Sequence, residues 1–112
     1  EGDIPNLKPI ILQSLKAHGL SPINDSTQKS KVVTQWQYSS HDALQRQRQQ
    51  VIVSWELDEK EKAVVVYVRH EAQEIESNIS LGIEYTSISP NLNLESAILD
   101  DISRRILNIG KP

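Results

Sequence analysis

The spacing of apolar residues predicts an amphipathic helix near each end of the chain. The first covers residues 7–18, begins after the capping residue Asn6 and ends at Gly19. The second opens at Ser89-Pro90-Asn91 and closes at Gly110. In the first helix Leu7, Ile11, Leu15 and His18 share one face, and in the second the apolar residues Leu94, Ile98, Ile102, Ile106 and Ile109 recur along one stripe. Both helices therefore have one face to bury.

Between the helices, apolar and polar residues alternate with a period of two, which predicts strands. We expect four strands, over residues 31–38, 44–57, 63–73 and 79–88. The charged residues 58–62 join the second strand to the third and predict a solvated hairpin turn. The fourth strand has the most regular alternation, and its apolar side chains are Ile79, Leu81, Ile83 and Tyr85. Each strand thus has one apolar face to turn toward a core.

The order of elements is therefore helix, four strands, helix (α-β-β-β-β-α). Short connections make neighbouring strands antiparallel, and two helices with one apolar face each can both pack on a single sheet. The sequence predicts an α+β fold, in which a four-stranded antiparallel sheet has the N- and C-terminal helices packed on one face. With 112 residues, the chain has the size of one domain, and we expect residues 1–112 to form a single one.

Composition narrows the chemistry that the chain can perform. It has no Cys, which excludes disulfides, thiolate metal sites and a Cys nucleophile. Its longest apolar run, residues 63–68, is far shorter than the ~20 residues that a membrane-spanning helix needs. The chain also has no Met, and we therefore expect a mature or excised fragment whose targeting segment has been removed.

The titratable residues show no spacing typical of a metal or catalytic site. His18, His41 and His70 are far apart, and we expect them at a helix end, in a loop and on a solvated or half-buried strand surface, respectively. We predict no cofactor and no metal. A hydrolase that uses His70 with Glu71 is one alternative, and it requires a pocket around both side chains.

The most unusual segment is Gln45-Arg46-Gln47-Arg48-Gln49-Gln50, which leads directly into an apolar strand. Alternation places its two arginines on one face, and a paired strand could bring Arg69 close to them. Guanidinium groups bind phosphate or carboxylate, and nearby aromatic rings can stack on a ligand. The predicted partner-binding residues are Arg46, Arg48, Arg69, Trp36 and Tyr38. The alternative is that the arginines pair with glutamates across strands and keep an exposed sheet soluble.

The sequence has a net charge of −3, and the acidic excess lies in its second half. Residues 1–56 have one excess positive charge, whereas the remainder has four excess negative ones. Such a balance does not favour nucleic acid, although a local basic patch can still bind it. A protein partner is therefore the first expectation.

Thr34-Gln35-Trp36, followed ten residues later by Arg46-Gln47-Arg48-Gln49-Gln50-Val51, resembles small bacterial envelope domains with a T-x-W strand and an R-x-R strand between two helices. The chain is similar in this respect to the helix-grip domains of BamC-like lipoproteins, and in its helix-sheet-helix order to LptE-like lipoproteins. It lacks their lipidated Cys. The resemblance implies a non-catalytic envelope component, periplasmic or membrane-associated through a removed N-terminal segment.

Together these observations predict a non-enzymatic protein-interaction domain of a bacterial cell-envelope protein or assembly. The alternative is a nucleic-acid or acidic-ligand binding module that uses the strand carrying Arg46 and Arg48 with the nearby aromatic residues.

Overall fold

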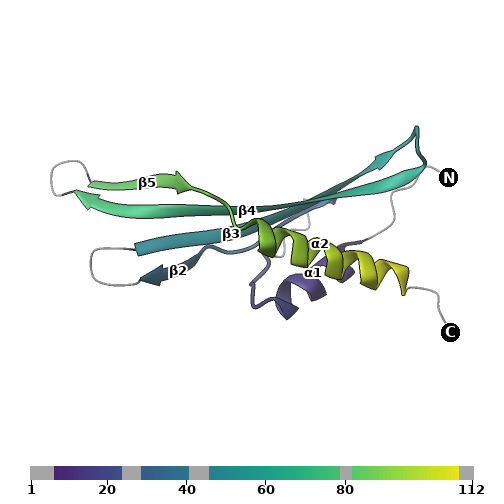
Figure 1. The fold of residues 1–112 in the computed structure, drawn as a ribbon, viewed down its shortest axis with the longest axis horizontal. Helices are drawn as coiled ribbons and strands as arrows, with labels where there is room; N and C mark the ends of the chain where they lie inside the picture. The colour runs from purple at the N-terminus through teal and green to yellow at the C-terminus, as the bar shows by residue number, and fades with distance from the viewer. Residues whose placement is uncertain (1–6, 24–28, 41–45, 79–81, 109–112) are drawn as a thin grey trace.

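The computed structural model describes residues 7–23, 29–40, 46–78 and 82–108, in the order helix, five strands, helix (Figure 1). Every strand pairing is antiparallel, so the predicted α+β class and its terminal helices are confirmed. The predictions for Asn6, His41, Ile79, Leu81, Ile109 and Gly110 lie outside the described residues. The elements are α1 Lys8–Ala17, β1 Lys31–Val33, β2 Gln37–Ser40, β3 Arg46–Asp58, β4 Ala63–Asn78, β5 Gly82–Ile88 and α2 Leu92–Leu107.

The sheet has the order β1-β3-β4-β5, and β2 also pairs with β3. β1 and β2 follow one another along the same edge of β3 and together occupy one strand position. The five strands therefore fill four positions in the sheet, the number that the sequence predicted. The prediction of a single unbroken strand over residues 31–38 was wrong, since β1 ends at Val33 and β2 begins at Gln37.

Thr34 causes this break in the edge strand. Its backbone N–H donates to the Val51 carbonyl oxygen at 2.9 Å, but the Val51 N–H donates to the Thr34 hydroxyl oxygen at 2.8 Å. The hydroxyl thus stands where a regular ladder would place the backbone carbonyl. The next residue, Gln35, turns away and donates its backbone N–H to the Ser21 carbonyl oxygen at 2.8 Å. On the other side of Thr34, an isolated antiparallel bridge joins it to Pro22, and the Ile23 N–H donates to the Val33 carbonyl oxygen at 2.8 Å.

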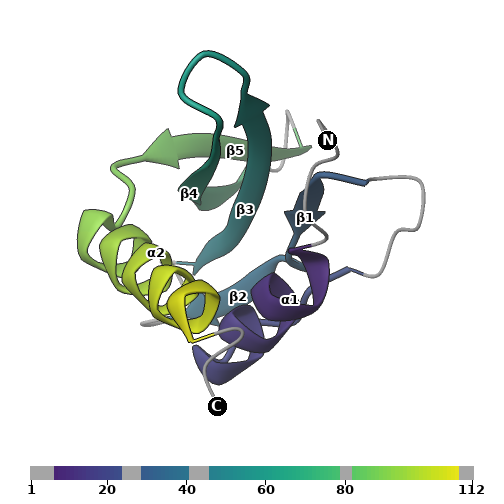
Figure 2. The ribbon, with the colours of Figure 1, turned by 90° about the vertical axis from the view of Figure 1, so that its right-hand side faces the viewer.

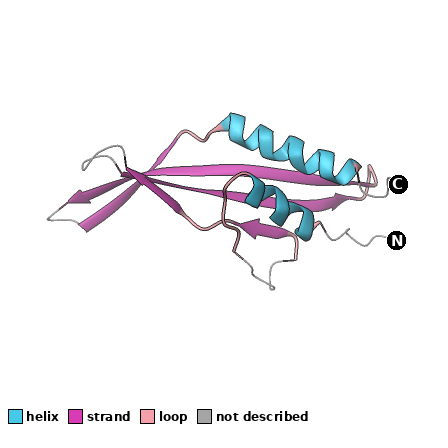
Figure 3. Cartoon of the chain, turned by 90° about the horizontal axis from the view of Figure 1, so that it is seen from below, coloured by secondary structure: helices cyan, strands magenta, loops and turns pink. Residues whose placement is uncertain are grey.

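The two central strands are longer than the helices that lie on them. β4 continues to Asn78, five residues beyond its predicted end, and spans roughly 50 Å at 3.3 Å per residue. α2 also has 16 residues but spans only about 24 Å. The helices therefore cover one half of the sheet, and the other half extends past them (Figures 1 and 3).

We call the covered part the proximal half: β1, residues 51–58 of β3 and residues 63–70 of β4. The remainder is the distal half: β2, residues 46–50 of β3, residues 71–78 of β4, and β5. The two helices lie side by side on the same face of the proximal half (Figure 2). The core between helices and strands consists of Leu7, Ile11, Leu15, Leu20, Val32, Val51, Val53, Trp55, Ile98 and Ile102.

The predicted helix boundaries agree with the structure to within a few residues. α1 ends in a Schellman motif, in which Leu20 N–H donates to the Leu15 carbonyl and Gly19 N–H to the Lys16 carbonyl. Gly19 has φ +79°, a left-handed conformation that favours glycine. At the start of α2, the Asn91 side-chain oxygen accepts the Leu94 N–H at 3.0 Å.

β5 departs most from the prediction. Its alternation suggested that one face would be buried, but Ile83 is 61% exposed and Tyr85 is 46% exposed. The reason is the register: β5 pairs with residues 72–78 of β4 so that Ile83 and Tyr85 lie on the sheet face turned away from both helices, and Glu84 and Thr86 lie on the helix side. An apolar strand face thus lies on a part of the sheet that no described element covers.

Candidate functional site

The strand register aligns side chains in rows on the distal face turned away from the helices. Two adjacent rows cross the sheet from β2 or β3 to β5: Tyr38, Arg48, Gln73 and Ser87 in one, and Arg46, Ile75 and Tyr85 in the other. Side chains at alternate positions share a face, so both arginines of the Gln-Arg segment lie on this one. Tyr38 accompanies them from β2, and Trp36 approaches from the break before that strand.

Arg48 is held between two aromatic rings. Its guanidinium carbon lies 4.0 Å from the Trp36 ring centroid and 3.7 Å from that of Tyr85. Its Nε donates to the Gln73 side-chain oxygen at 2.7 Å. The planar guanidinium suits this position because both of its faces can stack on rings while its edge donates a hydrogen bond. Arg48 therefore links the edge segment, β3, β4 and β5.

Replacing Arg48 with Lys is expected to destabilise the protein by about 1–2 kcal/mol, because an ammonium group cannot stack on two rings and bond Gln73 at once. Chemical denaturation followed by circular dichroism measures the loss. Arg69→Lys is the matched control, since that side chain is exposed on the same face, and it should change the free energy of unfolding by less than about 0.5 kcal/mol. Equal effects of the two substitutions would show that the stacking contributes nothing.

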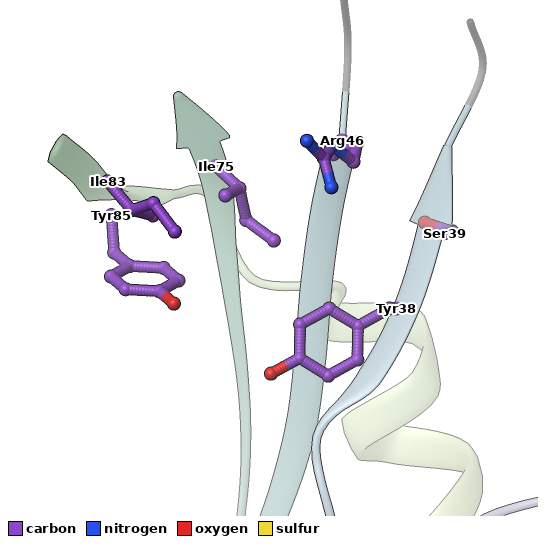
Figure 4. A pocket seen from close by; sticks show the side chains of 6 residues that line it. All are labelled: Tyr38, Ser39, Arg46, Ile75, Ile83 and Tyr85. Atoms are coloured by element: carbon purple, nitrogen blue, oxygen red, sulfur yellow. The ribbon is translucent and has the colours of Figure 1, made fainter. Parts of the chain in front are cut away.

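Beside this stack lies a groove of about 390 Å³. Tyr38 on β2 stands on one side of it, Ile83 and Tyr85 of β5 stand on the other, and Arg46 and Ile75 lie between them (Figure 4). Tyr38 is 65% exposed. The lining is thus mostly apolar and aromatic, with a single charged side chain, a composition typical of ligand and peptide sites.

Arg46 is the charged residue of the groove. Among the described residues its side chain makes no hydrogen bond, ion pair or ring contact, in contrast to that of Arg48. It lies opposite Ile75, and the described lining residues include no carboxylate. Arg46 therefore offers an uncompensated guanidinium at the edge of an apolar surface.

Arg69 does not join the other two arginines. It lies opposite Ile52, so the pair of Gln50 and Glu71 separates it from Arg48 along the sheet. Its guanidinium forms an ion pair with Glu71 at 3.4 Å. The structure thus places all five predicted residues on one face but assembles no cluster of three guanidinium groups.

Sequence reasoning missed three apolar residues of the groove: Ile75, Ile83 and Tyr85. The signal was present in the alternation of β5, which correctly put Ile83 and Tyr85 on one face. The alternation does not give the register between strands, which places Tyr85 opposite Ile75, in the row of Arg46 and next to the row of Arg48.

The opposite face of the distal half has a different charge. Glu74, Glu76 and Glu84 are all exposed there, and Glu76 lies opposite Glu84. No described Lys or Arg shares this face of the distal strands, since Arg46 and Arg48 occupy the other one. The distal half therefore has one acidic face and one apolar face with arginines.

His70 is buried beneath the start of α2, which corrects the predicted solvated or half-buried position. Its Nδ1 accepts the Asn91 backbone N–H at 2.9 Å, so Nε2 holds the proton and donates it to the Gln49 side-chain oxygen at 2.6 Å. The His70 backbone N–H donates to Glu95 at 2.8 Å. Burial lowers the pKa of His70 below its usual 6.5, although the Glu95 carboxylate opposes this.

These bonds give His70 a positioning role at the junction of β4 and α2. Glu71, the neighbouring residue, points to the opposite face of the strand and bonds Gln50 and Arg69. The hydrolase alternative requires His70 and Glu71 to line one pocket. In the structure their side chains lie on opposite faces of β4 and do not share one.

A second polar cluster joins the two helices. The buried Ser14 hydroxyl donates to the Asp101 carboxylate at 2.7 Å, and Arg105 Nε donates to the same oxygen at 2.9 Å. The Ser14 bond, followed by the Arg105 bond, lowers the pKa of Asp101 below its usual value. This cluster fixes the packing of α1 on α2.

Within the described ranges, no group of three or more His, Asp or Glu side chains is arranged to hold a metal ion. Neither described helix is both long and apolar enough to span a bilayer.

The candidate site is a shallow apolar groove with one guanidinium that has no described partner, on a sheet face that no described element covers. Comparisons with protein-family models, with curated proteins and with solved structures found no match to this chain.

Proposed function

We propose that this chain is a non-enzymatic protein-interaction domain, which docks a partner in the groove on its distal sheet face. One observation above all supports the proposal: the apolar face of β5 is exposed beside Tyr38 and Arg46, where no described element covers it. Exposed apolar surface that is rimmed by polar groups is typical of interaction sites. The bacterial-envelope setting depends on the sequence resemblance and stays a prediction.

The division of the sheet fits a docking role. The buried core lies in the proximal half, between the helices and β1, β3 and β4. The groove lies in the distal half, on the opposite face, so its side chains are free to contact a partner without disturbing that core. Paired strands present those side chains, and their backbones are already ordered before a partner binds.

The charge pattern favours a protein partner over nucleic acid. Binding to a phosphate backbone requires several free cations along one track. Here Arg48 is held between two rings, Arg69 is paired with Glu71, and only Arg46 of these three arginines is free among the described residues. The acidic glutamates of the opposite face further reduce attraction for a polyanion.

Selection from a displayed random-peptide library tests the proposal. Peptides selected on the unaltered protein should lose at least about tenfold in affinity for the variant Ile83→Asp, since a carboxylate in the groove must be desolvated when an apolar side chain enters. Leu107→Asp is the matched control, because Leu107 is similarly exposed but lies on α2. It should leave the affinity unchanged.

Thermal unfolding of both variants confirms that each is folded before its binding is compared. Peptides that bind Ile83→Asp as tightly as the unaltered protein, or that are lost in Leu107→Asp, would place the docking surface elsewhere.

A further inference from the structure

We infer that the occupant of the groove is an extended peptide segment of a partner, in which an aliphatic or aromatic side chain lies next to a carboxylate. The inference rests on the proposed docking function and goes further by naming the chemistry of the partner. It follows from the shape, the charge and the two faces of the distal half.

The apolar part of the occupant follows from the lining. Two tyrosines and two isoleucines surround the groove, and Ile75 lies on β4 between the side formed by Tyr38 and the side formed by Ile83 and Tyr85 (Figure 4). Its volume of about 390 Å³ is near the lower end of the range for ligand sites, roughly 300–1,000 Å³. A groove of this size fits one or two apolar side chains rather than a folded surface.

The carboxylate follows from Arg46. The guanidinium lines the groove and has no described partner, and its fork of N–H donors matches a carboxylate in bidentate geometry. The described lining residues provide no competing acidic group, because Glu74, Glu76 and Glu84 all point to the other face. An apolar segment that ends or continues in Asp, Glu or a free C-terminus therefore satisfies both parts of the groove.

A second copy of the chain is a poorer occupant of this groove. Stacking two distal faces with β3 on β3 would bring the arginines of one copy, Arg46 and Arg48, against those of the other. Placing the acidic face of one copy on this face of another would satisfy the arginines but leave Ile83 and Tyr85 against glutamates. Only a segment with both apolar and acidic groups matches the whole groove.

Two displayed libraries, identical except at one central position, test the inference. Both place random apolar residues beside that position, which is Asp or Glu in the first library and Asn or Gln in the second. On the unaltered protein, we expect the acidic library to yield binders with at least about tenfold higher affinity than the amide library, and this difference should shrink as salt is raised.

Protein variants assign the difference to one residue. Arg46→Gln should bring the acidic binders down to the affinity of the amide binders, and Arg46→Glu should weaken them further. Arg69→Gln is the matched control, since it removes a guanidinium from the same face outside the groove. It should leave the acidic binders unaffected.

The outcomes separate this inference from the docking function. Equal affinities from both libraries, with all binding lost in Ile83→Asp, would overturn the acidic partner and leave the docking function standing. If the acidic binders kept their affinity for the Arg46→Gln variant, the inference of an acidic partner would also be wrong. If neither library yields a peptide that is sensitive to Ile83→Asp, the docking function itself is wrong.

Discussion

Replacing Ile98 with Ala is expected to lower the free energy of unfolding by about 2–5 kcal/mol. Ile98 lies on α2, is fully buried and belongs to the core that joins both helices to the proximal half of the sheet. Truncation removes buried methyl and methylene groups and leaves a cavity that the close-packed neighbours fill only in part. Urea denaturation, followed by tryptophan fluorescence and by circular dichroism, measures the change.

The matched control is the same substitution in the distal half. Ile83→Ala removes the same atoms from a side chain that is 61% exposed, so it should change the free energy of unfolding by less than about 0.5 kcal/mol. A loss at Ile83 as large as that at Ile98 would mean that β5 contributes to the folded core, and the separation between core and docking surface would be wrong.

Replacing Thr34 with Val is expected to lower the free energy of unfolding by about 1–3 kcal/mol, although the two side chains have nearly the same shape. The Thr34 hydroxyl is the acceptor for the Val51 backbone N–H, and both residues are fully buried. Val removes the acceptor and leaves that N–H without a partner where water does not reach it. Thermal and urea unfolding of the purified variant measure the loss.

Thr34→Ser keeps the hydroxyl and removes only a methyl group. It should therefore cost about 1 kcal/mol, less than the Val substitution. If Val were tolerated better than Ser, packing of the methyl group rather than the hydrogen bond would explain the Thr at this position. The comparison also tests why the edge strand breaks where it does.

Much of the fold could be predicted from periodicity and helix-stop signals. Apolar residues at helical spacing located both helices, and Gly19 followed by Leu20 located the end of α1 because only glycine readily adopts its left-handed conformation. Alternation located the strands and the charged tip between β3 and β4. The break at Thr34 was missed because a threonine hydroxyl that replaces a backbone carbonyl leaves no trace in a hydrophobic pattern.

The burial of His70 was within reach of the same reasoning. Alternation puts Val64, Val66 and Val68 on the helix-covered face, and His70 is the next position in that series. Its hydrogen bonds to Asn91 and Gln49, however, depend on where α2 begins relative to β4. That placement is a property of the tertiary structure.

The candidate site was only partly predictable, for a physical reason. Period two shows which side chains share a face, and it correctly grouped Arg46 with Arg48. It does not show whether another layer covers that face, and this is why Ile83 was expected in the core. Nor does it give the register between strands, which separates Arg69 from the groove and brings Tyr85 onto Arg48.

The most direct test of the docking surface is an NMR titration of the isotope-labelled chain with a peptide selected on the unaltered protein. We predict that the amide shifts that move will centre on Tyr38, Arg46, Ile75, Ile83 and Tyr85, while those of α2 stay in place. Shifts centred instead on the exposed leucines of α2, Leu92, Leu99 and Leu107, would show that partners bind the helix and that the distal face is not the docking surface.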